Sequence, residues 1–226
     1  MARHPALLFD LDGTLVDSVY QHVLAWESAL REEQIDLAVW RIHRRIGMSG
    51  GLFLDALARE LGREITPEQA QRLRRRHMDN FLSRADEVRA LPGARELLDE
   101  LTEHGAPWMI ATSGRRSTAV VGLRALGLAD DAPIVTRDDV VHAKPDPDLF
   151  LEAARRLDVP ATSCFVVGDS VWDLLAAQRA RALGIGVMSG GYGREELESA
   201  GAYRVYEDPG DLLEHIDEVG VRRGGE

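Results

Sequence analysis

Two carboxylates one residue apart follow an apolar run near the start of the chain. The run Leu7-Leu8-Phe9 leads directly into Asp10-Leu11-Asp12-Gly13. Side chains at positions i and i+2 of a strand point to the same face, so Asp10 and Asp12 can reach one metal ion or one substrate. Two carboxylates this close repel each other unless a cation or a proton offsets their charge. The spacing therefore predicts chemistry that uses a metal ion or moves a proton, with a simple turn as the alternative.

A second pair of acids, Asp169 and Asp173, follows another apolar run. Asp169 stands between Gly168 and Ser170, where that run ends. Hard cations such as Mg²⁺ bind carboxylate oxygens and keep several waters, so we expect both acids to bind a metal ion. Asp173 has a structural alternative, because Ser170-x-x-Asp173 is a capping-box pattern in which the carboxylate binds the backbone N–H of the cap residue.

Lys144 is the only lysine in the chain, and the other 26 basic residues are arginine. A single lysine in so arginine-rich a chain indicates a site that needs a compact ammonium on a flexible stem. The alternative is that this lysine occurs by chance. The next residues, Pro145-Asp146-Pro147, predict a helix with Asp146 as its N-cap and Pro147 as its first residue. Lys144 would then lie just outside that helix start, facing the strand ends.

Thr112-Ser113-Gly114 follow a further apolar run. The hydroxyls and successive backbone N–H groups of such a segment can bind phosphate oxygens, with the start of the next helix nearby. A polar strand end with a glycine turn is the alternative. With Lys144 on the opposite side, these three residues would form half of an anion-binding clamp.

These side chains need a scaffold that brings strand ends together. Beyond residue 90 the chain alternates short apolar runs with helical segments. This alternation predicts an α/β fold, a Rossmann-like parallel sheet with helices on both faces. Ligands of such sheets bind outside the carboxyl ends of the strands, where the residues above are expected. After the strand before Asp10, the expected strands are 108–111, 134–135, 164–167 and 185–188, and the expected helices are 93–104, 117–127, 147–157 and 171–183.

The segment 17–89 differs, with helical periodicity and almost no strand signal. Helices are expected over 19–30, over 52–61 and from Thr66-Pro67 onward, where a capping box opens a helix. Residues 17–90 hold 12 Arg and 12 acidic residues, so the whole net charge of −11 belongs to the rest of the chain. We expect a small all-helical cap domain at 17–89 and an α/β core domain formed by 1–16 and 90–226. The basic run Arg72 to Arg76 is expected to be a solvated helix face.

Composition narrows the class of protein. The chain has 226 residues, 45% of them hydrophobic, which is ample for a packed core. The N-terminus lacks the pattern of a signal peptide and no apolar run approaches a membrane span, so we expect a cytoplasmic protein. Its acidic charge argues against nucleic acid or a membrane as partner. We expect a monomer or homodimer in which the single cysteine, Cys164, is a buried structural thiol.

The motifs, in this order, resemble those of the haloacid dehalogenase superfamily of phosphohydrolases. The inserted helical segment looks like the cap domain of the branch that contains phosphoglycolate phosphatases, β-phosphoglucomutases and small sugar phosphatases. The likeness in architecture extends over nearly the whole chain. The matching motifs are Asp10-Leu11-Asp12-Gly13-Thr14, Thr112-Ser113-Gly114, Lys144-Pro145 and Gly168-Asp169-Ser170-Val171-Trp172-Asp173.

The resemblance implies a role for each of these residues. Asp10 would be the nucleophile that forms an aspartyl-phosphate, and Asp12 would protonate the leaving oxygen and then activate water. Thr112 and Lys144 would bind the phosphoryl oxygens. The implied cofactor is Mg²⁺, and the implied partner is a small phosphorylated metabolite. The ion would be held by the Asp10 carboxylate, the main-chain carbonyl of Asp12, Asp169 and Asp173.

Alternative chemistries of the superfamily are tested by particular residues. A dehalogenase lacks the second acid, so Asp12 speaks against cleavage of a carbon–halogen bond. Phosphonate hydrolases use a cap lysine, and the cap segment has none. A β-phosphoglucomutase-like phosphoryl transferase is the main rival, because Ser18, His22 and Trp26 resemble its first cap helix. His22 is expected to contact the substrate, with a histidine on the helix surface as the alternative. The loop Gly47 to Gly51 lacks the arginine that mutases place there, which favours a hydrolase. A catalytically silent binding module on the same fold is the third possibility.

Overall fold

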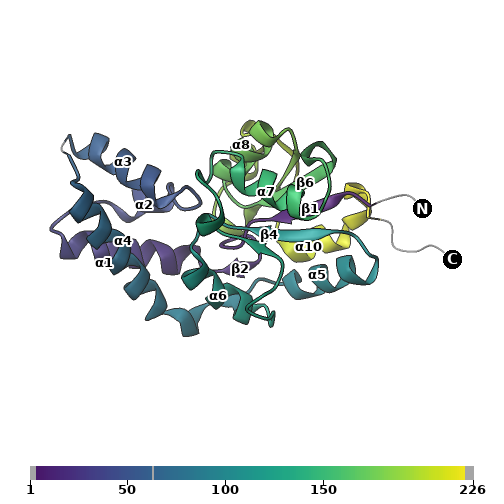
Figure 1. The fold of residues 1–226 in the computed structure, drawn as a ribbon, viewed down its shortest axis with the longest axis horizontal. Coiled ribbons are helices and arrows are strands. Elements are labelled where there is room, and N and C mark those ends of the chain that lie inside the picture. The colour runs from purple at the N-terminus through teal and green to yellow at the C-terminus, as the bar shows by residue number, and fades with distance from the viewer. Residues whose placement is uncertain (1–3, 63, 222–226) are drawn as a thin grey trace.

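The computed structural model describes residues 4–62 and 64–221. Its main feature is a six-stranded parallel sheet in the order β5-β4-β1-β6-β7-β8, which confirms the predicted α/β class (Figure 1). The central strand pairs with both neighbours, with Leu8 opposite Met109 on one side and Val166 on the other. The strands are β1 (Ala6–Phe9), β4 (Trp108–Ala111), β5 (Ile134–Val135), β6 (Cys164–Gly168), β7 (Leu183–Val187) and β8 (Ala202–Tyr206).

Helices cover both faces of this sheet (Figure 1). Side chains alternate along a strand, so Leu7 and Phe9 of β1 enter one hydrophobic cluster and Ala6 and Leu8 enter another on the opposite face. The first cluster is covered by α5 (Ala94–Glu103), α6 (Arg116–Ala125) and α10 (Pro209–Glu214), and the second by α7 (Asp148–Arg156) and α8 (Val171–Ala180). A small cluster lies under α9 (Arg194–Ser199), and short 3-10 turns occur at Ala85–Glu87, Arg137–Asp139, Ala161–Ser163, Met188–Gly190 and Ile216–Val219.

Two expectations about these elements need correction. The strand β8 was not expected, because at the sheet edge only its last two residues are buried and the sequence shows no apolar run. Asp146 is not the N-cap of α7. Pro147 occupies that position, while the Asp146 carboxylate pairs with Arg179 at 3.3 Å. Cys164 is buried as expected, and burial raises the pKa of its thiol to about 11.

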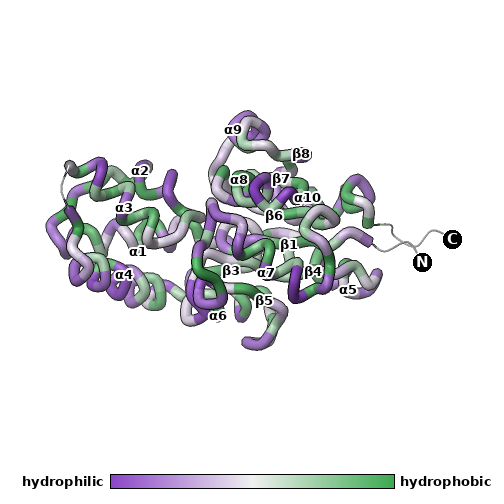
Figure 2. The backbone as a smooth tube through the Cα atoms, turned by 45° about the horizontal axis from the view of Figure 1, so that its top comes forward, coloured by the Kyte–Doolittle hydropathy of each residue, from purple (hydrophilic) through white to green (hydrophobic). Residues whose placement is uncertain are grey.

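The remaining helices are inserted between β1 and β4 and have a hydrophobic cluster of their own. They are α1 (Val19–Glu32), α2 (Val39–His43), α3 (Gly50–Leu61) and α4 (Pro67–Leu82). Figure 2 shows hydrophilic and hydrophobic stretches alternating along α4, as an amphipathic helix requires. Trp26, Phe53 and Leu57 are buried in this cluster. Three of these helices were expected, and the short α2 was not.

The chain passes between sheet and inserted helices twice, at β2 (Val16–Asp17) and β3 (Arg89–Ala90). These two segments pair with each other as an antiparallel ribbon, with Val16 opposite Ala90. In the part of the chain that the structure describes, no helix has the length and apolar character needed to span a bilayer.

Candidate active site

The carboxyl edge of the sheet gathers most of the residues singled out in the sequence. Asp10 follows β1, Thr112 follows β4 and Asp169 follows β6, while Asp173 lies in the first turn of α8. Lys144 lies in the loop that leads to α7. The parallel sheet places these strand ends side by side, because β1 pairs with both β4 and β6.

Three buried carboxylates lie close together, and one ammonium group pairs with two of them. Asp10, Asp169 and Asp173 each offer an oxygen, and these oxygens lie within 4.8 Å of one another. The Nζ atom of Lys144 forms an ion pair with Asp10 and lies 2.8 Å from Oδ1 of Asp173. Lys144 itself is fully buried, with its ammonium 5.1 Å from the centre of the Phe150 ring. The cluster therefore carries more negative than positive charge.

This imbalance is visible in the pKa values. Burial raises the pKa of Asp10 to about 7, against the effect of Lys144, and the charges of Asp173 and Asp12 add to the rise. Burial and the charges of Asp173 and Asp10 raise the pKa of Asp169 well above 3.8. Burial disfavours the charged form of Lys144, but Asp10 and Asp173 outweigh it and raise the pKa of Lys144. Carboxylates that lack positive charge suit a hard divalent cation, so the donor set fits the implied metal ion.

Asp169 is fixed by close packing on both sides. Its Oδ1 accepts a hydrogen bond of 3.0 Å from the hydroxyl of Thr14. Gly190 and Gly13 leave the space for its carboxylate, since a Cβ atom would lie 1.7 Å from Oδ2 at Gly190 and 2.6 Å away at Gly13. Gly13 also has a φ of +84°, in the left-handed region that favours glycine.

Asp173 has two contacts at once. Its Oδ2 accepts hydrogen bonds from the backbone N–H of Ser170 at 3.2 Å and from the Ser170 hydroxyl at 2.5 Å. The predicted capping box is therefore present at the start of α8. The other oxygen, Oδ1, faces Lys144. Capping thus fixes the orientation of a carboxylate that also belongs to the buried cluster.

Asp12 lies outside this cluster and contacts the helices instead. Its Oδ1 accepts a 2.6 Å hydrogen bond from Ser18 and lies 3.2 Å from Nε2 of His22. Burial acts to raise the pKa of Asp12, but His22 and Ser18 outweigh it and hold that pKa below 3.8. The two acids of the first motif therefore have opposite electrostatic surroundings.

His22, which was expected to contact substrate, forms part of a histidine pair. Its Nδ1 lies 3.1 Å from Nε2 of His77, and its ring stacks on Phe81 with centroids 3.9 Å apart. His77 also stacks on Trp26 at 4.2 Å, and desolvation lowers its pKa well below 6.5. Sequence reasoning missed His77, although its four-residue spacing from Phe81 places both on one face of α4.

Thr112, Ser113 and Gly114 line a cavity of about 770 Å³ together with Asp10, Asp12 and His22. The Thr112 hydroxyl accepts a 2.9 Å hydrogen bond from the Gly114 N–H, and the Ser113 hydroxyl donates one of 2.9 Å to the Gly47 carbonyl. The fully buried Lys144 is not among the lining residues, so it reaches Asp10 from within the protein.

The inserted helices supply the other wall of this cavity. Trp26, Met48 and Phe53 contribute apolar surface. Ser49 instead caps α3, accepting a 3.3 Å hydrogen bond from Leu52. The basic run lies on a largely exposed helix face, as expected, and three of its exposed arginines also border the cavity, namely Arg72, Arg74 and Arg75.

Comparison with known proteins gives a consistent result. A family model described as haloacid dehalogenase-like hydrolase matches residues 4–181. A phosphoglycolate phosphatase of Rhodospirillum rubrum is 33% identical over 213 residues, 90% of this chain and 87% of that protein. A β-phosphoglucomutase of Bacillus subtilis is 32% identical over 193 residues, 82% of this chain and 84% of that protein. The crystal structure of a hydrolase from Pseudomonas syringae is 56% identical, covers 95% of this chain and 99% of that one, and superposes with a TM-score of 0.94.

Proposed function

This chain belongs to the haloacid dehalogenase-like hydrolases, and on that premise we propose that it is a Mg²⁺-dependent phosphatase of a small phosphorylated metabolite. One observation carries the proposal. Asp10 lines a cavity large enough for a metabolite and at the same time belongs to the buried cluster with Asp169, Asp173 and Lys144. A nucleophilic carboxylate must be open to the substrate on one side, and on the other side it needs neighbouring charged groups that set its protonation state. Asp10 has both.

In the first half-reaction, a carboxylate oxygen of Asp10 attacks phosphorus. The bond from phosphorus to the leaving oxygen breaks, and Asp12 gives that oxygen a proton. In the second half-reaction, Asp12 takes a proton from a water molecule whose oxygen attacks the aspartyl-phosphate, which releases inorganic phosphate and restores Asp10. The lowered pKa of Asp12 keeps its carboxylate ionised in the free protein, and the ionised form is the one that acts as the base in the second half-reaction.

Charge on the transferring group is neutralised from within the protein. Lys144 supplies a permanent positive charge beside Asp10, and Thr112, Ser113 and Gly114 supply hydroxyl and N–H donors on the cavity side. Asp10, Asp169, Asp173 and the main-chain carbonyl of Asp12 would hold Mg²⁺. When bound, the ion supplies positive charge that keeps Asp10 ionised and offsets the charge of the phosphoryl oxygens.

We also propose that residues 17–89 act as a cap domain over a core formed by residues 1–16 and 90–226. The separate hydrophobic cluster of α1 to α4 and the paired connections β2 and β3 support this division. Closure of the cap would exclude bulk water from the aspartyl-phosphate.

The test is release of inorganic phosphate from a panel of small phosphomonoesters, with and without Mg²⁺. Wild type should be active only with the ion, and Asp10→Asn should lose at least about a thousandfold in rate, because the nucleophile is gone. Asp55→Asn, an equivalent change at an exposed position on α3, serves as the control.

Two results would contradict the proposal. Equal rates for wild type and Asp10→Asn would remove Asp10 from the chemistry, and a wild type inert across the panel would favour a silent binding module. A β-phosphoglucomutase-like transferase is distinguished by its product, because it would return phosphate to a sugar instead of releasing it.

A further inference from the structure

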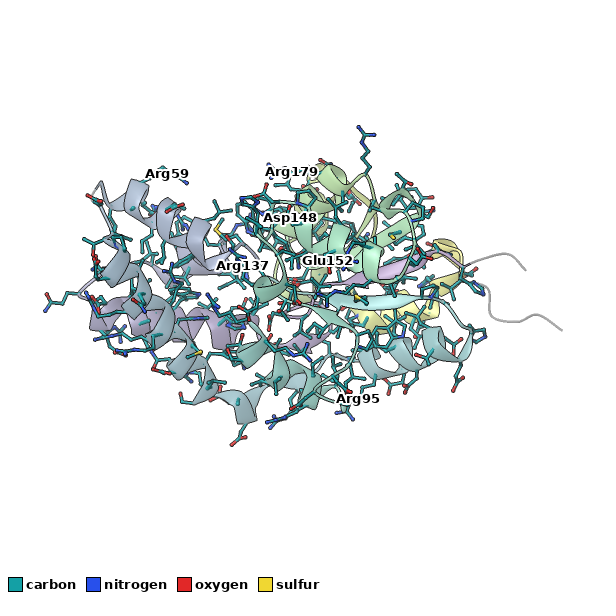
Figure 3. The ribbon with its side chains drawn as sticks, in the orientation of Figure 1. Arg59, Arg95, Arg137, Asp148, Glu152 and Arg179 are labelled. Carbon is teal, nitrogen blue, oxygen red and sulfur yellow. The ribbon has the colours of Figure 1, made fainter. Side chains whose placement is uncertain are left out.

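Two histidines of the inserted helices form a chain of contacts that ends at Asp12. Nε2 of His22 lies 3.2 Å from Oδ1 of Asp12, and Nδ1 of the same ring lies 3.1 Å from Nε2 of His77. All three side chains line the cavity, as does Arg137, which lies where the inserted helices meet the sheet (Figure 3). We propose that His77 is a positioning residue of the phosphatase reaction, which holds the ring of His22 so that its Nε2–H points at Asp12. This inference rests on the proposed function, in which Asp12 moves the proton.

The packing of α4 against α1 determines where His77 lies. Leu73, His77 and Phe81 follow one another at intervals of four residues, so they lie on one face of α4. Leu73 and Phe81 are fully buried, and the His77 ring stacks on Trp26 of α1 with centroids 4.2 Å apart. His77 is therefore held beside His22 by the contact between the two helices, before any substrate binds.

The His22 ring needs a partner at each nitrogen to keep one orientation. Its plane lies against Phe81, with ring centroids 3.9 Å apart and an interplanar angle of 3°. Stacking fixes this plane, but it allows the ring to turn by half a revolution about the Cβ–Cγ bond, which would place a carbon atom where Nε2 faces Asp12. The contact between Nδ1 and His77 opposes that turn, because the turned ring would lose both hydrogen bonds at once.

His77 also determines which nitrogen of His22 carries the proton. An ionised carboxylate only accepts hydrogen bonds, so Nε2 of His22 is the donor to Asp12. In a neutral His22 ring, Nδ1 is then an acceptor, and Nε2–H of His77 is the donor that it needs. Desolvation lowers the pKa of His77 well below 6.5, so His77 is a neutral ring with one N–H to give. In a protonated His22 the hydrogen bond at Nδ1 reverses its direction, and Nε2–H still points at Asp12.

The two donors to Asp12 both act on the same carboxylate oxygen. Oδ1 accepts a 2.6 Å hydrogen bond from Ser18 and faces Nε2 of His22. Among the described residues none donates a hydrogen bond to Oδ2, and a Cβ atom at Gly114 in the cavity wall would lie 3.9 Å from it. The proton that Asp12 gives to the leaving oxygen is therefore expected on Oδ2, and both donors stay on Oδ1 after the transfer. Without the donor from His22, Oδ1 competes for this proton, and Oδ2 holds it for a smaller fraction of the time.

Variants of His77 separate its hydrogen bond from its packing. His77→Phe keeps a ring against Trp26 and removes the nitrogen that faces His22, whereas His77→Gln keeps an amide that donates or accepts there. His77→Leu removes the nitrogen with a different apolar side chain, so the test does not depend on one variant that folds. His215→Gln, at an exposed position outside the cavity lining, is the control and should match wild type.

The probes are phenyl phosphate and para-nitrophenyl phosphate, both with Mg²⁺. Nitrophenolate is stable as an anion and leaves with little help from an acid, whereas phenolate needs the proton. The quantity compared is kcat/KM, because it covers only the steps up to the first phosphoryl transfer. We expect His77→Phe and His77→Leu to lower kcat/KM about tenfold to a hundredfold for phenyl phosphate and less than about threefold for the nitrophenyl ester. His77→Gln should retain most of the activity on both, and in a His22→Phe background His77→Phe should cause no further selective loss.

A spectroscopic measurement does not depend on turnover. In protein labelled with ¹⁵N-histidine, the ring nitrogen signals of His22, assigned with a His22→Gln variant, report which nitrogen carries the proton. Wild type and His77→Gln should each show a single form with a proton on Nε2, and His77→Phe should show a second tautomer.

Three results would overturn the inference: an equal loss of kcat/KM on both esters in His77→Phe, a His77→Gln protein as impaired as His77→Phe, or His22 signals that His77→Phe leaves unchanged. In each case wild type would still hydrolyse phosphomonoesters, so the proposed function would stand. A wild type that is inert on every ester would instead reject the proposed function, and the His22 signals would still decide whether His77 fixes the ring.

Discussion

Around Asp10, single residues set the chemistry through a local balance of charge. Lys144 is shared between Asp10 and Asp173, and Asp169 has only the Thr14 hydroxyl as a hydrogen-bond donor from another side chain among the described residues. The raised pKa values of Asp10 and Asp169 reflect that shortage. We interpret the cluster as a site whose carboxylates lower the stability of the protein until a cation binds.

Substitution of Asp169 tests this interpretation through pH. A carboxyl group whose folded pKa is raised contributes stability below its ordinary value near 3.8, and that contribution is lost as the pH rises through the folded pKa. Without metal, Asp169→Asn should therefore be more stable than wild type at pH 8, by about 1–3 kcal/mol. The stability difference between the variant and wild type should be smaller at pH 5. The free energy of unfolding from urea titrations at both pH values provides the measurement.

With Mg²⁺ present, wild type should be more stable than Asp169→Asn, because the ion stabilises wild type by binding and the variant lacks one of the ligands. The Asp55→Asn protein should follow wild type under all four conditions. A metal-free Asp169→Asn protein that is less stable than wild type at pH 8 would contradict the interpretation.

At the scale of elements, the inserted helices touch the core on two sides. On one side the connections β2 and β3 form the paired ribbon. On the other side His43 Nε2 lies 2.9 Å from the Gly190 carbonyl, and the Arg44 guanidinium pairs with Glu196 and lies 4.0 Å from the centre of the Tyr192 ring. Gly190 also borders Asp169, so the proposed closure of the helices would be physically connected to order at the proposed metal site.

Limited proteolysis tests whether the Arg44 contacts hold the helices closed. Inorganic phosphate with Mg²⁺ should protect the segments 16–18 and 89–93 of wild type, slowing tryptic cleavage after the exposed Arg89 severalfold. Arg44→Ala should lose most of that protection, because its ion pair and ring contact are removed. Arg41→Ala is the matched control, since Arg41 pairs with Glu60 inside the inserted helices. Identical cleavage of wild type with and without the ligands would count against a moving cap.

For the molecule as a whole, three large hydrophobic clusters define how stability is distributed. Two lie on opposite faces of the sheet and share strand β1, whereas the third lies within α1 to α4. The helical part is electrically neutral over residues 17–90, and the sheet part carries the acidic charge. An arginine-lined cavity in an acidic protein concentrates the attraction for anions at one place.

A cavity-forming substitution in the helical cluster tests the proposed division into cap and core. Leu57 is fully buried there, and Leu57→Ala should cost about 2–5 kcal/mol in local stability. Amide hydrogen exchange should speed up in α1, α3 and α4, while β1, β4 and β6 keep their protection. Leu8→Ala, at a fully buried position of β1, should speed exchange in the sheet. Uniformly faster exchange in the Leu57→Ala protein would show a single cooperative unit.

The sequence by itself determined the parallel sheet except for its edge strand β8, and it determined which residues stand at the carboxyl ends of the strands. Apolar runs that end in acids or hydroxyls are a local pattern, and parallel strands always bring their carboxyl ends together. That is why Asp10, Thr112 and Asp169 could be placed near one another in advance. The functional roles assigned to them remain predictions.

Only the tertiary structure decided which helical side chains meet that edge. The contact of His22 with Asp12 and His77, the position of three α4 arginines at the border of the cavity, and the pairing of β2 with β3 all depend on how the inserted helices pack on one another and on the core. A helix with arginine on several faces gives no local signal for which face is covered. Periodicity describes one element at a time, whereas the wall of a cavity is formed by segments far apart in the chain.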